Sequence, residues 1–195
     1  MHLLYYLRRF KRYHKYDGIT PNSLNTITWQ DRELANQIAA RMGREVWNSL
    51  VGASIECIKQ LDLLHMTDTE WNGSKDCLRC ALSTLFRPGI GVARLTKALH
   101  RKRPNFIPIC DSVLLRAMKV KRGDKAENVI DCMEKLRKLT QQYPRNLSAL
   151  ANLSKLCRDC EMQLSELRIL EILHWLEFGP FKPSQQELSS YIQNV

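Results

Sequence analysis

The sequence has no apolar run approaching the roughly 20 residues that a membrane-spanning helix requires. It also has no stretch of about four to eight residues in which apolar and polar side chains alternate, as they do in a half-buried strand. Internal repeats and low-complexity linkers are absent too. These absences exclude a spanning segment and argue against a β-fold or a repeat array.

Acidic residues are in short supply. Thirty Lys and Arg face twenty Asp and Glu, which gives a formal charge of +10 and a pI near 9.4. This imbalance favours a polyanionic partner, either nucleic acid or an acidic membrane surface. The first sixteen residues contain five Lys and Arg and no acid, so they are interpreted as a basic, tyrosine-rich arm. Membrane binding or targeting is the alternative, although Leu3–Leu7 is too short for the apolar region of a signal peptide.

Helical spacing of apolar residues is present in almost every segment after Thr28, which predicts an all-α fold in one domain, 1–195. Thr28 and Asp31 are typical of the start of a helix that would end at Gly43, and a second helix is expected from Ser54. The polar stretch 67–74 is interpreted as a loop. Further helices are expected over 75–86, from 92 to before Pro104, after Asp111, and over 124–140, 146–157, 165–178 and from 184. The helix over 165–178 is apolar enough to be the spine of the core.

The most informative stretch is a helix, a tight turn and a second helix over residues 81–100. The turn is Arg87-Pro88-Gly89-Ile90-Gly91. Its glycines permit a positive φ and leave room for another backbone, so the amides that follow can point at an anion such as a phosphate. Arg94, Lys97 and Arg101 share one face of the second helix, opposite an apolar face, which predicts a basic surface. The alternative is a simple turn beside a solvated face.

This stretch resembles the helix-hairpin-helix DNA glycosylase superfamily, in a diverged bacterial branch. In that superfamily a Leu-Pro-Gly-Val/Ile-Gly turn precedes an essential Asp by about twenty residues, and here Asp111 stands twenty residues after Gly91. The approach Phe106-Ile107-Pro108-Ile109-Cys110-Asp111 is also similar. The pattern differs at Arg87, which replaces the leucine, and at Arg94-Leu95, which replaces a common Thr-Ala pair.

The resemblance implies two helical lobes with double-stranded DNA in the cleft between them. The hairpin-bearing lobe would cover about 45–122, and 1–44 with 123–195 would form the other. Asp111 would be the catalytic carboxylate. The expected DNA-binding residues are Pro88, Gly89, Ile90, Gly91, Arg94, Lys97, Arg101 and Lys102. A base must be flipped into a pocket lined by aromatic or apolar groups, and Trp71, in the polar stretch, is the candidate for a stacking or wedge residue. His100, in the basic stretch, is a further candidate for a phosphate contact.

Relatives that also cut the strand carry a lysine where this chain has Ala93. The resemblance therefore implies a monofunctional enzyme that leaves an abasic site, without a cofactor. We expect a monomer in the cytoplasm, associated with the nucleoid, acting in repair or in defence against modified viral DNA. The rival hypothesis is a non-catalytic DNA-binding protein in which Asp111 only caps a helix.

The cysteines suggest a third possibility. Cys77-x-x-Cys80 and Cys157-x-x-Cys160 could supply four thiolates to zinc. Both pairs lie in or beside expected helices, where cysteines at this spacing ordinarily pack in the core, so no metal is expected. The four closely spaced cysteines of iron–sulfur relatives are not found. The seven cysteines are interpreted as reduced thiols.

Overall fold

The fold is entirely helical in the part of the chain that the computed structural model describes, which is 2–121, 123–159, 162–180 and 182–187. Within these residues the helices are α1 (His2–Arg9), α2 (Lys11–Gly18), α3 (Trp29–Gln37), α4 (Arg44–Asn48), α5 (Asp68–Leu85), α6 (Val92–His100), α7 (Ser112–Ala117), α8 (Lys125–Gln142), α9 (Pro144–Asp159) and α10 (Glu166–Phe178). The only β-pairing there is an isolated bridge between Thr26 and Ser54. The expected all-α class is confirmed.

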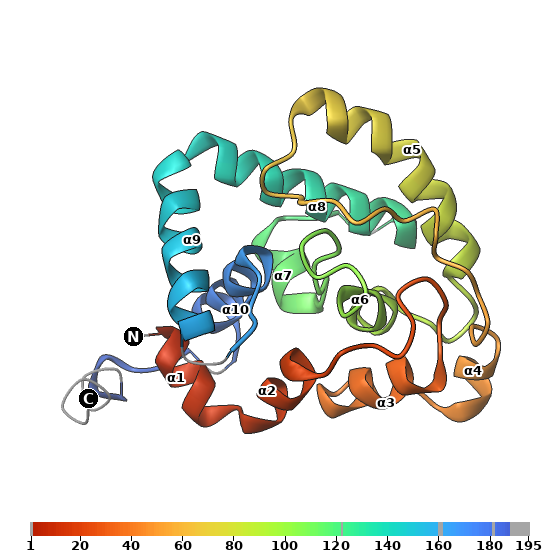
Figure 1. Cartoon of the computed structure of the whole chain (residues 1–195), viewed down its shortest axis with the longest axis horizontal. Coiled ribbons are helices and arrows are strands. Elements are labelled where there is room, and N and C mark those ends of the chain that lie inside the picture. Colours follow the sequence, from red (N-terminus) through yellow and green to blue (C-terminus); the bar gives the residue numbers. More distant parts are fainter. Residues whose placement is uncertain (1, 122, 160–161, 181, 188–195) are drawn as a thin grey trace.

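Three helices occupy the middle of the molecule, and the others surround them (Figure 1). α6, α7 and α10 are central. α5 packs against α8 on one side, α9 closes the adjoining edge, and α1 to α4 run along the opposite edge. One large hydrophobic core joins these elements, and it contains buried residues from α1, α5, α6, α8 and α10. The predicted core helix is confirmed, because most of α10 is buried.

Two predictions between Ser54 and Ser74 are wrong. Residues 54–66 form turns rather than a helix, although Ile55 and Ile58 are buried as that helix would have required. The polar stretch that follows is the first part of α5 and not a loop. Thr67 accepts a hydrogen bond from the amide of Glu70, and the Glu70 side chain returns to the Thr67 backbone. This capping box allows a polar sequence to begin a helix.

The helix that begins at Trp29 is shorter than expected. Its predicted capping box is present, since the Thr28 amide donates to the Asp31 carboxylate at 2.6 Å. The helix ends at Gln37 rather than at Gly43 because Ala39 and Arg41 adopt positive φ angles of 61° and 51°. These residues turn the chain toward α4, which the sequence did not predict.

The N-terminal segment is part of the core and not a free arm. Tyr6 and Tyr16 are buried, and the ring of Phe10 lies 5.0 Å from that of Trp175 in α10. The sequence suggested an arm because five Lys and Arg stand within the first sixteen residues without any acidic residue. The tyrosines nevertheless supply large buried surfaces, and their hydroxyl groups find polar partners.

No helix in the described residues combines the length and the apolar character needed to cross a membrane. Near the end of the described chain, Ser184 and Glu187 form the predicted capping box: the Glu187 carboxylate accepts from the Ser184 amide at 2.9 Å. The first turn of the helix predicted from residue 184 covers 185–187, and the rest of that helix lies outside the described residues.

Candidate functional site

The turn between α5 and α6 contains two glycines in different situations. Gly89 has a φ of +79°, and a Cβ added to it would lie 3.1 Å from Val46 Cγ2. The fold therefore requires glycine there. Gly91, at the N-cap of α6, has an ordinary φ of −91°, and an added Cβ would meet nothing within 4 Å. The space in front of Gly91 is open, beside α6 amides that have no acceptor within the helix.

Asp111 is the N-cap of α7, and it is partly exposed. Its Oδ1 accepts hydrogen bonds from the amides of Val113 and Leu114, both at 2.9 Å. Both bonds end on one oxygen, so Oδ2 lies outside the cap. Next to it, the Cys110 amide donates to Thr96 Oγ1 at 3.1 Å, which attaches this segment to α6.

A small cavity of about 40 Å³ lies beside Asp111. Its lining includes Lys97 from α6, Tyr6 from α1, and Glu171 and Trp175 from α10. Lys97 Nζ donates to the carbonyl of Ile38 at 2.6 Å. Burial lowers the pKa of Lys97, and the charge of Asp111 opposes that shift. The cavity is large enough for water but not for a nucleobase.

A buried ion cluster forms one wall of this cavity. Arg168 donates to Asp17 Oδ1 at 3.0 Å, to Glu171 Oε2 at 3.1 Å and to the Tyr6 hydroxyl at 3.0 Å. Glu171 Oε1 also accepts from the Ile109 amide at 2.9 Å. Burial raises the pKa of Glu171 to about 8, against the opposing effect of Arg168. The cluster joins α1, α2 and α10 beside Asp111.

Sequence reasoning missed Arg168 and Glu171, since it treated residues 165–178 only as a core helix. A signal was present. These two opposite charges stand three residues apart within a strongly apolar helix, and charged residues are rarely buried unless they are paired. That pattern indicates an ion pair inside the core.

The side chains of the basic face predicted for α6 are only partly exposed, and they are bound within the protein. Arg94 donates to the carbonyls of Ala40 at 3.1 Å and Gly89 at 2.6 Å, and Arg101 donates to the carbonyl of Ile19. With Lys97, all three predicted phosphate contacts thus bind backbone oxygens of their own chain. Neither the predicted phosphate-binding face nor the alternative of a solvated face describes these side chains. The reason is that α6 packs against α3 and the segment after it, where carbonyls outside regular helices need donors.

The residues after α6 are buried as well. Lys102 is fully buried and forms an ion pair of 2.9 Å with Asp31. Arg103 is 2% exposed and donates to the carbonyls of Leu24 and Ile55, among others. His100 Nδ1 donates to the carbonyl of Ile107 at 2.8 Å, and burial holds the pKa of His100 well below its usual value. Neither Lys102 nor His100 is placed to reach a phosphate.

Trp71 is not a loop residue. It lies in the first half of α5, is 1% exposed, and has the guanidinium of Arg137 5.9 Å from its ring centroid. It therefore packs inside the protein rather than lining the Asp111 cavity. The expectation of a wedge depended on the loop that the structure replaces with a helix.

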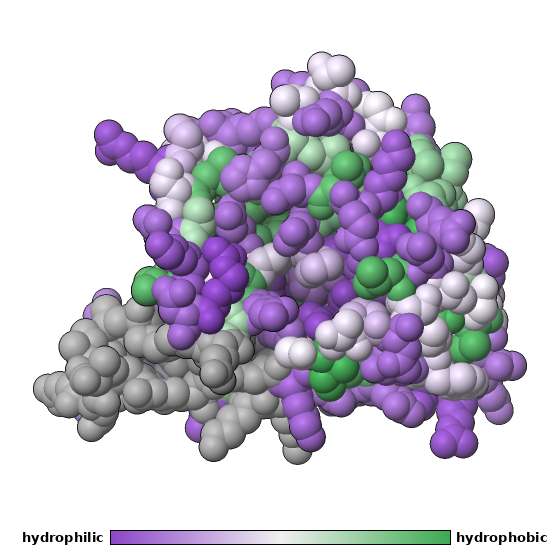
Figure 2. Space-filling model, viewed as in Figure 1, coloured by the Kyte–Doolittle hydropathy of each residue, from purple (hydrophilic) through white to green (hydrophobic). Residues whose placement is uncertain are grey.

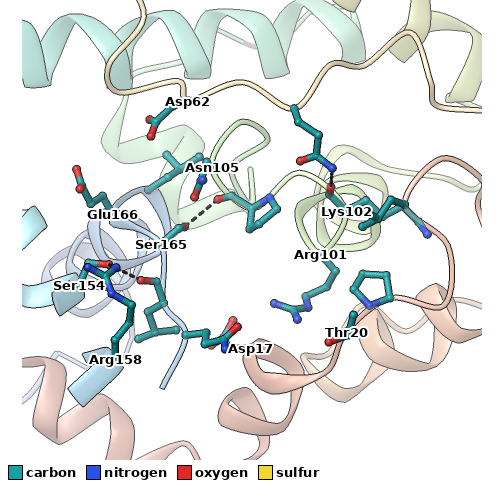
Figure 3. A pocket seen from close by; sticks show the side chains of 17 residues that line it. Asp17, Thr20, Asp62, Arg101, Lys102, Asn105, Ser154, Arg158, Ser165 and Glu166 are labelled. Carbon is teal, nitrogen blue, oxygen red and sulfur yellow. Dashed lines mark hydrogen bonds between the residues drawn. The ribbon is translucent and has the colours of Figure 1, made fainter. Parts of the chain in front are cut away.

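A larger, open cavity of about 880 Å³ lies on another part of the surface (Figure 3). It is bordered by the C-terminal end of α6 and the N-terminal end of α10, and Arg101, Arg158, Asp62 and Glu166 are among its lining residues. Figure 2 shows mainly hydrophilic side chains around a central hollow on this face. Neither Asp111 nor the hairpin lines this cavity, so its size does not make it the candidate site.

The cysteine pairs are divided between surface and interior. Cys77 and Cys80 are exposed on α5, contrary to the expectation of core packing, whereas Cys157 is buried in α9. Cys160 lies outside the described residues. Within those residues, no three His, Cys, Asp or Glu side chains gather as metal ligands would.

The chain belongs to a family of unknown function, DUF6308, whose model matches residues 35–178. The match includes the hairpin, Asp111 and α10, whereas Tyr6 and Asp17 precede it. No curated protein and no solved structure was found to match the chain.

Proposed function

We propose that this protein is a monofunctional DNA glycosylase, which hydrolyses the N-glycosidic bond of a damaged or modified base and leaves an abasic site. One observation carries the proposal: Asp111 is partly exposed beside a cavity, and only one of its carboxylate oxygens takes part in the helix cap. A carboxylate held in this way can stabilise a cationic sugar or activate water.

The hairpin supports DNA as the substrate. Gly91 is needed neither for a positive φ nor to avoid a clash within the chain. A side chain there would instead obstruct a ligand that approaches the first amides of α6. A backbone phosphate is a ligand of suitable size and charge for such a helix end. In this proposal, duplex DNA lies across the hairpin, between a lobe of about 45–122 and the rest of the chain.

The lack of an available amine supports hydrolysis without strand cleavage. Ala93 offers no amine, and the Lys97 amine already donates to the carbonyl of Ile38. In the proposed reaction the C1′–N bond breaks and its electron pair leaves with the base, while Asp111 stabilises the positive charge on the sugar. Water then forms the new bond at C1′, and its proton passes to Asp111.

The base pocket must open before this reaction. A cavity of about 40 Å³ cannot accept a base. Tyr6 and Trp175 line it from α1 and α10, and they offer aromatic faces on which a flipped base could stack. We therefore expect the α1 wall to move when a base enters.

The competing function is DNA binding without catalysis. The two hydrogen bonds from the α7 amides to Asp111 favour it, because an N-cap needs no other role. The chain offers a matched control: Asp124 caps α8 through Oδ1 in the same way, with bonds to the amides of Ala126 at 2.8 Å and Glu127 at 3.2 Å.

The test compares Asp111→Asn with Asp124→Asn on genomic DNAs that carry different modified bases. Released bases are identified by mass spectrometry, and melting temperature and duplex affinity are measured on the same preparations. Since Asn and Asp cap helices about equally well, both variants should fold. We expect Asp111→Asn alone to lose base release, by about two orders of magnitude or more. Activity within a few-fold of wild type would reject the catalytic role.

A second measurement tests the mode of reaction. Borohydride should trap no covalent protein–DNA complex, because Ala93 cannot form a Schiff base. Strand breaks should appear only after alkali. A trapped adduct would contradict the proposal and would identify Lys97 as the nucleophile.

A further inference from the structure

Two basic residues occupy backbone positions that favour glycine. Arg41 and Lys119 both have a φ of +51°, and both are exposed. This left-handed region is unfavourable for residues that carry a Cβ. Neither local conformational preference nor burial explains an arginine or a lysine there. Side chains held in such positions are found often at functional sites.

Lys119 stands where a helix ordinarily ends in glycine. It follows Met118, the C-cap of α7, and its amide donates to the Arg116 carbonyl at 2.9 Å, while the Val120 amide donates to Leu115 at 2.9 Å. Lys135 Nζ binds the Lys119 carbonyl at 3.0 Å, so the backbone of Lys119 is used and its ammonium group points away from the core. Glycine would serve this turn better.

The segment that contains Arg41 is attached to the hairpin by a single side chain. Arg94 Nε binds the carbonyl of Ala40 at 3.1 Å, and Arg94 Nη1 binds the carbonyl of Gly89 at 2.6 Å. Val46, in α4, also faces Gly89. Arg41 is therefore held near the turn while its own side chain remains exposed.

The segment after Lys119 reaches the hairpin at its other end. Lys125 Nζ donates to the carbonyl of Ile90 at 2.9 Å. Arg87 and Pro88 share a surface hollow of about 550 Å³ with Gly123 and Lys125. The segment that contains Arg41 precedes the hairpin in sequence, and the segment from Lys119 to Lys125 follows it. Both thus contact the turn at which the proposed function places a phosphate.

We propose that Arg41, Arg87, Lys119 and Lys121 form the surface that binds DNA backbone phosphates next to the one held by the hairpin. All four are exposed, and we call them the outer basic group. The inference rests on the proposed function for its choice of DNA as the polyanion. It replaces the α6 face predicted from the sequence, whose cations are bound to carbonyls. Each cation that neutralises a phosphate releases counterions, which makes binding salt-dependent.

The test uses glycine substitutions, which remove the charge and relieve the backbone at once. Arg41→Gly and Lys119→Gly should raise the melting temperature. The double variant should bind an unmodified duplex about tenfold more weakly, and its log–log salt slope should flatten by up to about 0.9 per lost phosphate contact. Fluorescence anisotropy at several salt concentrations measures both quantities. Unchanged affinity and slope would overturn the proposal.

Two controls separate charge from conformation and from location. Lys119→Arg should keep wild-type affinity, and a loss equal to that of Lys119→Gly would overturn the proposal. Lys155→Ala removes an exposed charge on α9, away from the hairpin, and should change nothing; an equal loss there would indicate general attraction rather than a surface.

A third set of measurements compares DNA with an anionic membrane as the partner. It also tests the proposed surface separately from the proposed glycosylase activity. If phosphatidylserine vesicles bind through the outer basic group and duplex DNA does not, the proposed nucleic-acid surface is wrong. Base release is measured on the same variants. If duplex binding depends on this group but the wild type releases no base, the glycosylase proposal is rejected and the proposed surface is retained. If the wild type releases bases but substitutions in the outer basic group do not change duplex affinity, only the proposed surface is rejected.

Discussion

Two groups of basic residues that look alike in the sequence have opposite positions in the protein. The inner basic group, Arg94, Lys97, Arg101, Lys102 and Arg103, extends along α6 and the turn after it, and binds backbone carbonyls of the same chain. The outer basic group is exposed around the hairpin. A net charge of +10 therefore overstates the charge available to a partner.

The difference arises from what surrounds each group. The inner group faces segments 19–25, 38–42 and 55–58, in which several carbonyls accept no hydrogen bond from a backbone amide. A buried carbonyl without a donor is costly, so long basic side chains that reach it stabilise the fold. The outer group faces solvent, where an isolated charge contributes little to stability. Substitutions should thus separate the groups into one that affects folding and one that affects binding.

The largest effect is expected at Arg103. Arg103→Ala would leave the carbonyls of Leu24 and Ile58 without a donor. At about 1 to 3 kcal/mol for each unsatisfied buried group, the loss at these two carbonyls should lower the free energy of unfolding by about 2 to 6 kcal/mol. Urea unfolding followed by circular dichroism measures it. Arg87→Ala, in the outer group, should stay within about 0.5 kcal/mol of wild type. If both variants lost similar free energy of unfolding, the inner and outer basic groups would not differ in their contribution to stability.

A somewhat smaller effect is expected at Lys102. Lys102→Met would leave the buried Asp31 carboxylate without its cation, which costs about 3 kcal/mol or more. The double variant Lys102→Met with Asp31→Asn should recover part of this loss, because it removes the uncompensated charge. A double-mutant cycle measures the coupling between the two residues. Additive losses would show that the ion pair does not stabilise the fold.

The two glycines of the hairpin sharpen the comparison at a single turn. Gly89→Ala places a Cβ at a positive φ and against Val46, and should destabilise the protein by about 1 to 2 kcal/mol. Gly91→Ala should leave stability unchanged or raise it slightly, since its φ suits any residue. Duplex affinity should fall in both variants. Full affinity in Gly91→Ala would show that no phosphate approaches there.

The smallest effect concerns pH and the wall of the Asp111 cavity. Burial raises the pKa of Glu171 from 4.5 to about 8 in the folded protein. Between these values the folded state retains a proton that the unfolded chain has lost, so the free energy of unfolding falls as pH rises through this window. We expect a decline of about 1 kcal/mol or more. Glu171→Gln should flatten it, as urea titrations at pH 5, 6.5 and 8 would show. An unchanged decline would assign it to other groups.

The sequence by itself determined the helical class, the hairpin, and the helices that begin at Val92, Ser112, Lys125 and Glu166. These depend on local signals: periodic apolar residues, caps and a glycine turn, each readable within one segment. It also placed Asp111 at the start of a helix, which the structure confirms. The sequence did not show which carboxylate oxygen of Asp111 caps that helix, because the folded environment of the side chain decides it.

Only the tertiary structure decided which charges are free. Lys102 and Lys121 both lie in basic stretches of the sequence. Lys102 nevertheless pairs with Asp31 in the interior, whereas Lys121 is exposed to solvent. Likewise, Arg168 and Glu171 lie beside Asp111 because α10 packs against α7. Helix periodicity indicates which face of a segment is apolar, but a long basic side chain can extend toward any nearby carbonyl. Apart from Gly89, the carbonyls that these side chains reach in other segments come from residues about 45 to 80 positions away, a proximity that packing alone creates.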